Sequence, residues 1–145
     1  TIGTLDGANI EIREQVGAEN IFIFGLQAHE VTSLKARGYA PETFVASNPD
    51  LARTLDMIDS GYFSPANVFD GKPIVGRLLS DGEPYCVLAD FAAYARAQDE
   101  VDALYLRPDE WSRKAVLNAL GMGTFSSDRS IREYAERIWR IKPVL

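Results

Sequence analysis

The spacing of apolar residues changes twice in the first 25 positions, which predicts a strand, a helix and a second strand. Thr1 to Leu5 is a short β-branched and apolar run, typical of a strand. Apolar residues then recur every four positions from Ala8 to Val16, which indicates one stripe of a helix that stops at Gly17. The run Ile21 to Phe24 has no polar alternation, so it suits a parallel strand that is covered on both faces. Residues 1–25 are therefore expected to form a right-handed βαβ unit.

Residues 26–145 show mainly helical spacing, divided by caps, prolines and glycines. Helices are expected from Ala28 to Arg37, from Pro41, from Pro49 to just before Gly61, from Lys72 to Ser80, from Phe91 to Leu106, from Pro108 to Leu120 and from Ser126 onward. Asn48 and Asp90 are expected to cap the helices that follow them, and Ser126, Ser127 and Asp128 are expected to cap the last helix. Ser130 with Glu133 offers a competing capping box for that helix. The segment Tyr85 to Leu88 reads as extended and is a candidate for a third strand.

Several apolar and aromatic side chains are expected to point inward. On the long helix these are Phe91, Tyr94, Val101, Leu104 and Tyr105, and on the last helix they are Ile131, Tyr134, Ala135, Ile138 and Trp139. The loop before Gly71 holds Tyr62, Phe63, Pro65 and Phe69, which either anchor the loop to its own domain or form a platform for a sugar. So many amphipathic helices on so small a sheet indicate that some apolar faces await a further segment.

The chain starts without a methionine and enters a strand at once. Processing or an expression boundary is one explanation, because natural domains usually begin with a polar lead-in. A second explanation is that the chain is the C-terminal piece of a longer protein. The second is the expectation adopted here, since the βαβ unit lacks the rest of its sheet.

Composition excludes several classes of protein. The net charge of −6 argues against non-specific nucleic-acid binding, which needs a basic face. No apolar run approaches the length of a membrane span, and there is no signal peptide or lipidation motif. The single cysteine, Cys86, excludes an internal disulfide and fits a reducing, cytoplasmic compartment.

Candidate chemistry is confined to the turn after the first strand. Ligands of open parallel sheets bind outside the carboxyl ends of the strands, where Asp6, Gly7 and Asn9 lie. Backbone N–H groups there could hold an anion, but Asp6 would repel phosphate and is itself placed to cap the helix, which is the favoured interpretation. The spacing from Gly3 to Gly7 is not the dinucleotide fingerprint. Structural cap and ligand contact both stay open for Asp6.

No other constellation suggests catalysis or metal binding. His29 is the only histidine and is expected in solvent, far from Cys86, so neither a metal set nor a nucleophile–base pair is expected. The acidic cluster near Asp99 is interpreted as a solvated face. The four lysines are expected on helices near charged neighbours, outside any apolar pocket. They are Lys35, Lys72, Lys114 and Lys142.

Specific motifs along the whole chain resemble the C-terminal region of the glycogen (α-glucan) phosphorylase family. They are Thr1 to Glu11, Glu19 to Gly25, Gly61 to Pro65, Val87 to Phe91 with Tyr94 and Gln98, Phe125 to Ile131, Tyr134 to Ala135, and Ile138 to Trp139. Ser130 stands where the family commonly has threonine, which keeps the hydroxyl group.

The resemblance implies an α/β fold class. Residues 1–145 would be the C-terminal portion of the second, cofactor-side Rossmann-like domain of a two-domain, GT-B type glycosyltransferase, helix-rich with two or three short parallel strands. The family transfers glucosyl units from α-1,4-glucan ends to inorganic phosphate and releases glucose 1-phosphate. It uses pyridoxal phosphate, whose phosphate group serves in proton transfer.

The residues that carry the family's chemistry do not map onto this chain. The cofactor lysine, the glycine-rich sugar loop and the phosphate-binding basic residues all precede the position that matches Thr1. No catalytic, cofactor or metal residue is therefore assigned, and no cofactor is expected in this fragment. Asp6, Gly7 and Asn9 are expected near the cleft as scaffold.

Two functional readings follow. The chain is either an inactive fragment of an α-glucan phosphorylase or a free-standing, non-catalytic helical interaction module derived from that domain. In the first reading its partner is the remainder of the parent polypeptide, and glucan and phosphate bind the parent. The unpaired strand edge also predicts self-association of the isolated piece.

Overall fold

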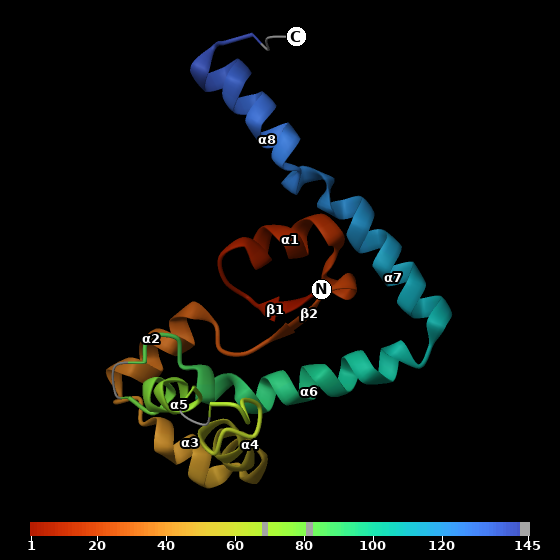
Figure 1. The fold of residues 1–145 in the computed structure, drawn as a ribbon. Helices are drawn as coiled ribbons and strands as arrows, with labels where there is room; N and C mark the ends of the chain where they lie inside the picture. The colour runs from red at the N-terminus through yellow and green to blue at the C-terminus, as the bar shows by residue number, and fades with distance from the viewer. Residues whose placement is uncertain (68–69, 81–82, 143–145) are drawn as a thin grey trace.

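The computed structural model describes residues 1–67, 70–80 and 83–142 (Figure 1). Its sheet consists of β1 (Ile2–Thr4) and β2 (Phe22–Phe24), joined by α1 (Ala8–Val16) and the 3₁₀ turn η1 (Ala18–Asn20). The two strands pair in parallel, with Ile2 opposite Phe22. The predicted βαβ unit in the first 25 residues is therefore confirmed.

The rest of the described chain is mainly helical, as the spacing predicted. The helices are α2 (Ala28–Ala36), α3 (Pro41–Ser47), α4 (Pro49–Asp59), α5 (Lys72–Leu78), α6 (Val87–Tyr105), α7 (Pro108–Gly121), the 3₁₀ turn η2 (Met122–Phe125), α8 (Ser127–Glu133) and the π-helical segment η3 (Tyr134–Trp139). Asn48 caps α4 with its side-chain oxygen, and Ser126 caps α8 in the same way, so both predicted caps are confirmed.

The long helix α6 connects the two parts of the fold. Figure 1 shows α1 and α6 on opposite sides of the strands, with α2 to α5 gathered at one end of α6 and α7 leaving its other end. Helix α6 packs against β2, α3 and α7, whereas α1 packs against α7. The two-stranded sheet is thus held between helices that come from both ends of the chain.

The hydrophobic core lies among the helices and not in the sheet. Its buried members are Leu51, Leu55, Val75 and Leu88, from α4, α5 and α6. Helices α4 and α5 meet very closely at Gly71, where a Cβ atom would lie 1.9 Å from the carbonyl oxygen of Ile58. The space between the two backbones therefore accepts a glycine at position 71 and nothing larger.

The expected extended segment before the long helix is wrong, because α6 begins at Val87. Glu83 is buried, and its carboxylate accepts the backbone N–H groups of Tyr85 at 2.6 Å and Val87 at 3.0 Å. Cys86 adopts a left-handed conformation with φ 55° and is fully buried. Glu83 thus performs the capping that the sequence assigned to Asp90, which lies inside the first turn.

The start of α1 lacks the side-chain cap that was one of the two roles considered for Asp6. Gly7 is the N-terminal cap residue and no side chain caps the helix. The Asp6 carboxylate instead accepts the hydroxyl of Thr4 at 2.8 Å, while the Asp6 carbonyl oxygen accepts the N–H of Asn9. The side-chain cap predicted for Asp6 is therefore wrong, because the carboxylate turns back towards the strand.

Several aromatic side chains expected to be buried are exposed. Tyr94 and Tyr105 on α6 are 41% and 66% exposed, although Leu104 is buried as predicted. Tyr62 and Phe63 pack edge to face with each other and are more than half exposed, so they do not anchor their loop in a core. Phe69 lies outside the described residues.

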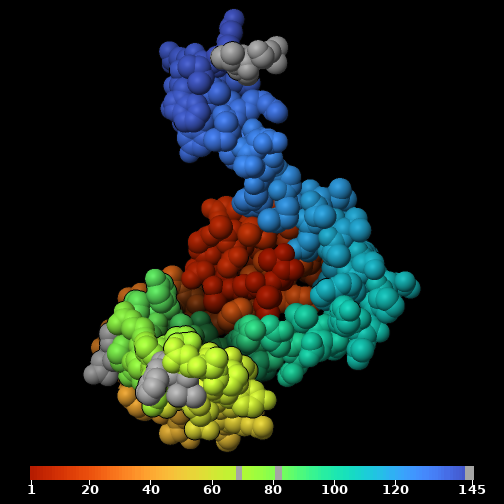
Figure 2. Space-filling view, viewed as in Figure 1, coloured from red at the N-terminus to blue at the C-terminus, as the bar shows by residue number. Residues whose placement is uncertain are grey.

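The C-terminal segment stands away from the rest of the molecule (Figure 2). The inward face predicted for the last helix is largely exposed, and Trp139 is 53% exposed. Tyr134 stacks on Trp139 with ring centroids 5.7 Å apart, and the helix changes from α to π at Tyr134. Glu133 and Arg137 form an ion pair at 3.3 Å on the opposite, charged side of this segment's sequence pattern. This apolar face therefore finds no cover among the described residues.

Candidate functional site

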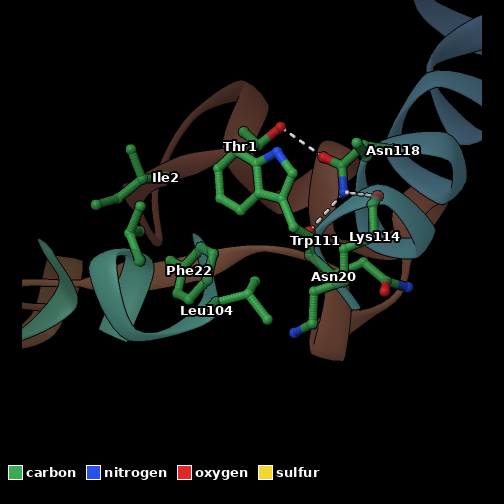
Figure 3. A pocket seen from close by; sticks show the side chains of 10 residues that line it. Thr1, Ile2, Asn20, Phe22, Leu104, Trp111, Lys114 and Asn118 are labelled. Carbon is green, nitrogen blue, oxygen red and sulfur yellow. Dashed lines mark hydrogen bonds between the residues drawn. The ribbon is translucent and has the colours of Figure 1, made fainter. Parts of the chain in front are cut away.

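A first hollow of about 230 Å³ lies at the amino ends of the two strands, between them and α6 and α7 (Figure 3). It is lined by Thr1, Ile2, Asn20, Phe22, Val101, Leu104, Trp111, Lys114, Ala115 and Asn118. Most of these side chains are apolar, so its chemistry depends on whether its few polar groups are free.

The amide of Asn118 is the centre of a hydrogen-bond network in this hollow. Its oxygen accepts the Thr1 hydroxyl at 2.6 Å, and its nitrogen donates to the carbonyl oxygens of Asn20 at 2.5 Å and Lys114 at 3.1 Å (Figure 3). The Asn118 side chain therefore ties the start of β1 and the turn before β2 to α7. Its bonding capacity is used by the fold itself.

Lys114 also takes part in this connection. Its ammonium group donates to the carbonyl oxygen of Glu19 and lies 5.5 Å from the centre of the Phe22 ring. Lys114 lines this largely apolar hollow, and Lys142 lies beyond the last helix and not on a helix as expected. Because the ammonium group of Lys114 and the amide of Asn118 already have partners within the fold, we interpret this hollow as a structural contact between the strands and α7 and not as a reaction site.

A second hollow of about 380 Å³ lies at the carboxyl ends of β1 and β2. It is lined by Thr4, Asp6, Phe24, Leu26, Val31, Tyr85, Val87, Asp90, Phe91 and Tyr94. These residues come from the ends of both strands, from α2 and from the first turns of α6. We call this hollow the strand-end pocket, and it occupies the edge where parallel sheets bind ligands.

Asp90 fixes the wall of the strand-end pocket that follows β2. Its Oδ1 accepts the backbone N–H of Leu26 at 2.7 Å. Its Oδ2 lies so close to Gly25, which has φ +82°, that a Cβ there would stand 2.6 Å away. Burial raises the pKa of the Asp90 carboxyl; the Leu26 N–H opposes this, and the charge of Asp6 adds to it.

The three residues predicted at the cleft have different positions. Asp6 lines the strand-end pocket. Gly7 has φ +48° with open space around its Cα, and the Asn9 amide packs against Gly3, where a Cβ would lie 2.7 Å from its nitrogen. The structure therefore places Asp6 with Asp90, while Gly7 and Asn9 shape the turn beside them. A scaffold role for the three stays a prediction.

Sequence reasoning missed the pocket residues contributed by α6 and the loop before it. Asp90 was assigned to helix capping and Tyr94 to the core, and Tyr85 was assigned to an extended segment. One signal could have found them: Asp90 and Tyr94 lie four residues apart, hence on one face of a helix. Nothing in the sequence indicated that this face meets the end of β2.

Other reactive side chains in the described part of the chain do not gather into a site. No group of three or more histidine, cysteine or acidic residues could hold a metal there. His29 is exposed on α2, as predicted, and burial raises the pKa of the Cys86 thiol. Among the described residues, no helix is long and apolar enough to cross a membrane.

Comparison with known proteins identifies the family. The profile of the family described as carbohydrate phosphorylase matches residues 1–141. The chain belongs to the carbohydrate phosphorylase family.

The individual relatives of this phosphorylase chain are named as glycogen phosphorylases. It is 52% identical to "Glycogen phosphorylase" of Synechocystis over all 145 residues. It is also 45% identical to the Chlamydia pneumoniae protein of that name over 141 residues, 97% of the chain, and 45% identical to the human "Glycogen phosphorylase, brain form" over 143 residues, 99% of the chain. The matched segment spans 17% of the length of each relative. Its place along the relatives stays a prediction.

Proposed function

We propose that the chain is part of an α-glucan phosphorylase, which transfers glucosyl units from the ends of α-1,4-glucans to inorganic phosphate and forms glucose 1-phosphate. The observation that carries this proposal is the 52% identity, over the whole chain, to a protein named glycogen phosphorylase. The relatives are several times longer than this chain, so the remainder of the parent polypeptide is its proposed partner, and the parent's substrates are the glucan and phosphate.

In this proposal the chain forms the C-terminal portion of the second, Rossmann-like domain of a GT-B enzyme. The parallel βαβ unit supports it, because two strands alone are too few for a parallel sheet that helices cover on both faces. The apolar face at Trp139 supports it as well, since that face lies open among the described residues. A cytoplasmic location is part of the same proposal and is supported by the single reduced cysteine, Cys86.

The parent is proposed to use pyridoxal phosphate, but the described residues do not suit that cofactor. The strand-end pocket carries the carboxylates of Asp6 and Asp90, which repel a phosphate group. The ammonium groups of the lysines on the described helices already have partners. Lys35 donates to the carbonyl oxygen of Pro84, Lys72 lies 3.9 Å from Asp59, and Lys114 donates to the carbonyl oxygen of Glu19. We therefore place the cofactor lysine outside this chain.

The first prediction is that this chain alone binds no pyridoxal phosphate and has no phosphorylase activity. Absorbance would be recorded after mixing the chain with the cofactor and removing the excess. A stoichiometric band that borohydride traps on one specific lysine would contradict the prediction. The Lys114→Arg variant is the matched control, because it keeps the charge at the apolar hollow and removes the amine.

The proposed function is tested on the full-length protein encoded by the gene. We expect it to form glucose 1-phosphate from an α-1,4-glucan and phosphate, and we expect a cofactor-lysine motif before the residue that corresponds to Thr1. The alternative, a non-catalytic helical interaction module, predicts neither. A full-length protein without phosphorolysis and without that motif would favour the module.

A further inference from the structure

The strand-end pocket has aromatic walls and several polar side chains, a combination that suits a ring-shaped, hydroxyl-rich ligand. Phe24 and Tyr94 meet edge to face with centroids 5.2 Å apart, and Phe91 lines the same cavity. Tyr85 stands at its edge with 77% of its surface exposed. Aromatic faces of this kind pack well on the flat apolar faces of a ring-shaped ligand.

The two carboxylates of the pocket each keep an acceptor available. Asp6 uses Oδ1 for the Thr4 hydroxyl, and Asp90 uses Oδ1 for the Leu26 N–H. Neither second oxygen has a hydrogen-bond partner among the described residues. An ionised carboxylate can accept several hydrogen bonds, so a ligand rich in O–H donors would be stabilised here.

The tyrosines of the pocket supply donors beside these acceptors. The Tyr94 hydroxyl oxygen accepts the side-chain N–H of Gln98 at 2.8 Å, which leaves its own proton free to donate. The Tyr85 hydroxyl has no partner in the part of the chain that the structure describes. The pocket therefore presents hydrogen-bond donors and acceptors together.

We propose that the strand-end pocket binds a neutral sugar, a glucosyl unit of an α-glucan, through hydroxyl groups on Asp6, Asp90, Tyr85 and Tyr94. A hydroxyl group both donates and accepts, which matches this mixed set of groups. A sugar phosphate is excluded because its anionic group would face two carboxylates. The identity of the sugar rests on the proposed function, whereas the neutral, hydroxyl-rich character of the ligand rests on the pocket.

The test uses the full-length protein and maltoheptaose as the probe. Isothermal titration calorimetry would compare the unsubstituted full-length protein with its Tyr94→Phe and Asp6→Asn variants. Tyr94→Phe removes one hydrogen-bond donor and Asp6→Asn removes one charged acceptor, and both keep the shape of the pocket. Each variant should bind maltoheptaose roughly fivefold more weakly, as expected for one lost hydrogen bond. The KM for glucan should rise by the same factor, and the KM for phosphate should stay unchanged.

The matched control is Tyr105→Phe, which makes the same change on the same helix outside the pocket. If Tyr94→Phe and Asp6→Asn bind maltoheptaose as tightly as the control does, the proposal is wrong. It is also wrong if tetramethylammonium displaces the sugar, because that would identify a cation site. Maltoheptaose binding without phosphorolysis would reject the proposed function and keep the sugar site, so the two failures are distinguishable.

Discussion

Tyr39 is a buried tyrosine beside the first turn of α6. Its side chain is 8% exposed, and its hydroxyl lies near the first-turn N–H groups of Leu88 and Ala89 without a hydrogen bond of ordinary geometry to any described residue. Burial, with the neighbouring charge of Glu83, raises the pKa of the Tyr39 hydroxyl from 10.0 to about 12. The neutral hydroxyl is therefore strongly favoured in the folded chain.

The second prediction concerns alkaline pH. The unfolded chain releases the Tyr39 proton near pH 10 and the folded chain near pH 12, so the free energy of unfolding should fall between these values. Tyr39→Phe should remove that part of the fall. At neutral pH it should leave stability unchanged or slightly higher, because no hydrogen bond is lost. Urea unfolding from pH 7 to 12 measures both effects, and an unchanged alkaline slope in the variant would contradict the assignment.

At the scale of elements, helix α6 depends on one buried carboxylate. Glu83 accepts two backbone N–H groups ahead of the first turn and is 4% exposed. The third prediction is that Glu83→Ala lowers the free energy of unfolding by about 1–3 kcal/mol, since two part-buried N–H groups lose their acceptor. Glu110→Ala, which removes an exposed ion pair with Arg107, should cost less than about 0.5 kcal/mol. Equal losses in urea unfolding would mean that Glu83 does not cap α6.

The C-terminal segment provides the fourth prediction. In the full-length protein we expect its apolar face to be covered, so Trp139→Ala should cost about 3–5 kcal/mol there. In the isolated chain, where Trp139 is half exposed, the same substitution should cost less than about 1 kcal/mol. Thermal unfolding of both proteins makes the comparison. A loss below about 1 kcal/mol in the full-length protein would mean that the predicted inward face is wrong.

Sequence patterns predicted elements well where local spacing decides them. The βαβ unit, the Asn48 cap and the Ser126 cap follow from residues within a few positions of one another. The start of α6 was missed because Glu83 acts from three residues before the left-handed Cys86, outside the usual cap position. Of the two carboxylates in the strand-end pocket, the sequence indicated only Asp6, because it directly follows its strand. Asp90 contacts Leu26, which lies 64 positions earlier in the chain, and no local pattern encodes that contact.

At the scale of the whole molecule, β1 has a neighbouring strand on one side only in the described sheet. Its other side presents unpaired backbone groups, and the C-terminal segment exposes further apolar surface. The fifth prediction is therefore that the isolated chain forms dimers or larger assemblies, or is only marginally stable. Light scattering across a range of concentrations is the test. A monodisperse monomer with a sharp cooperative melt would mean that the piece closes its own core.

The crossing of α4 and α5 at Gly71 limits how this chain can evolve. A side chain at position 71 would meet the backbone carbonyl oxygen of Ile58, and a backbone atom cannot rotate away as the end of a flexible side chain can. Any replacement thus requires the two helices to separate, which would open the core around Leu55 and Val75. We therefore expect no single substitution to be tolerated at position 71. Glycine could be replaced in evolution only together with compensating changes in both helices.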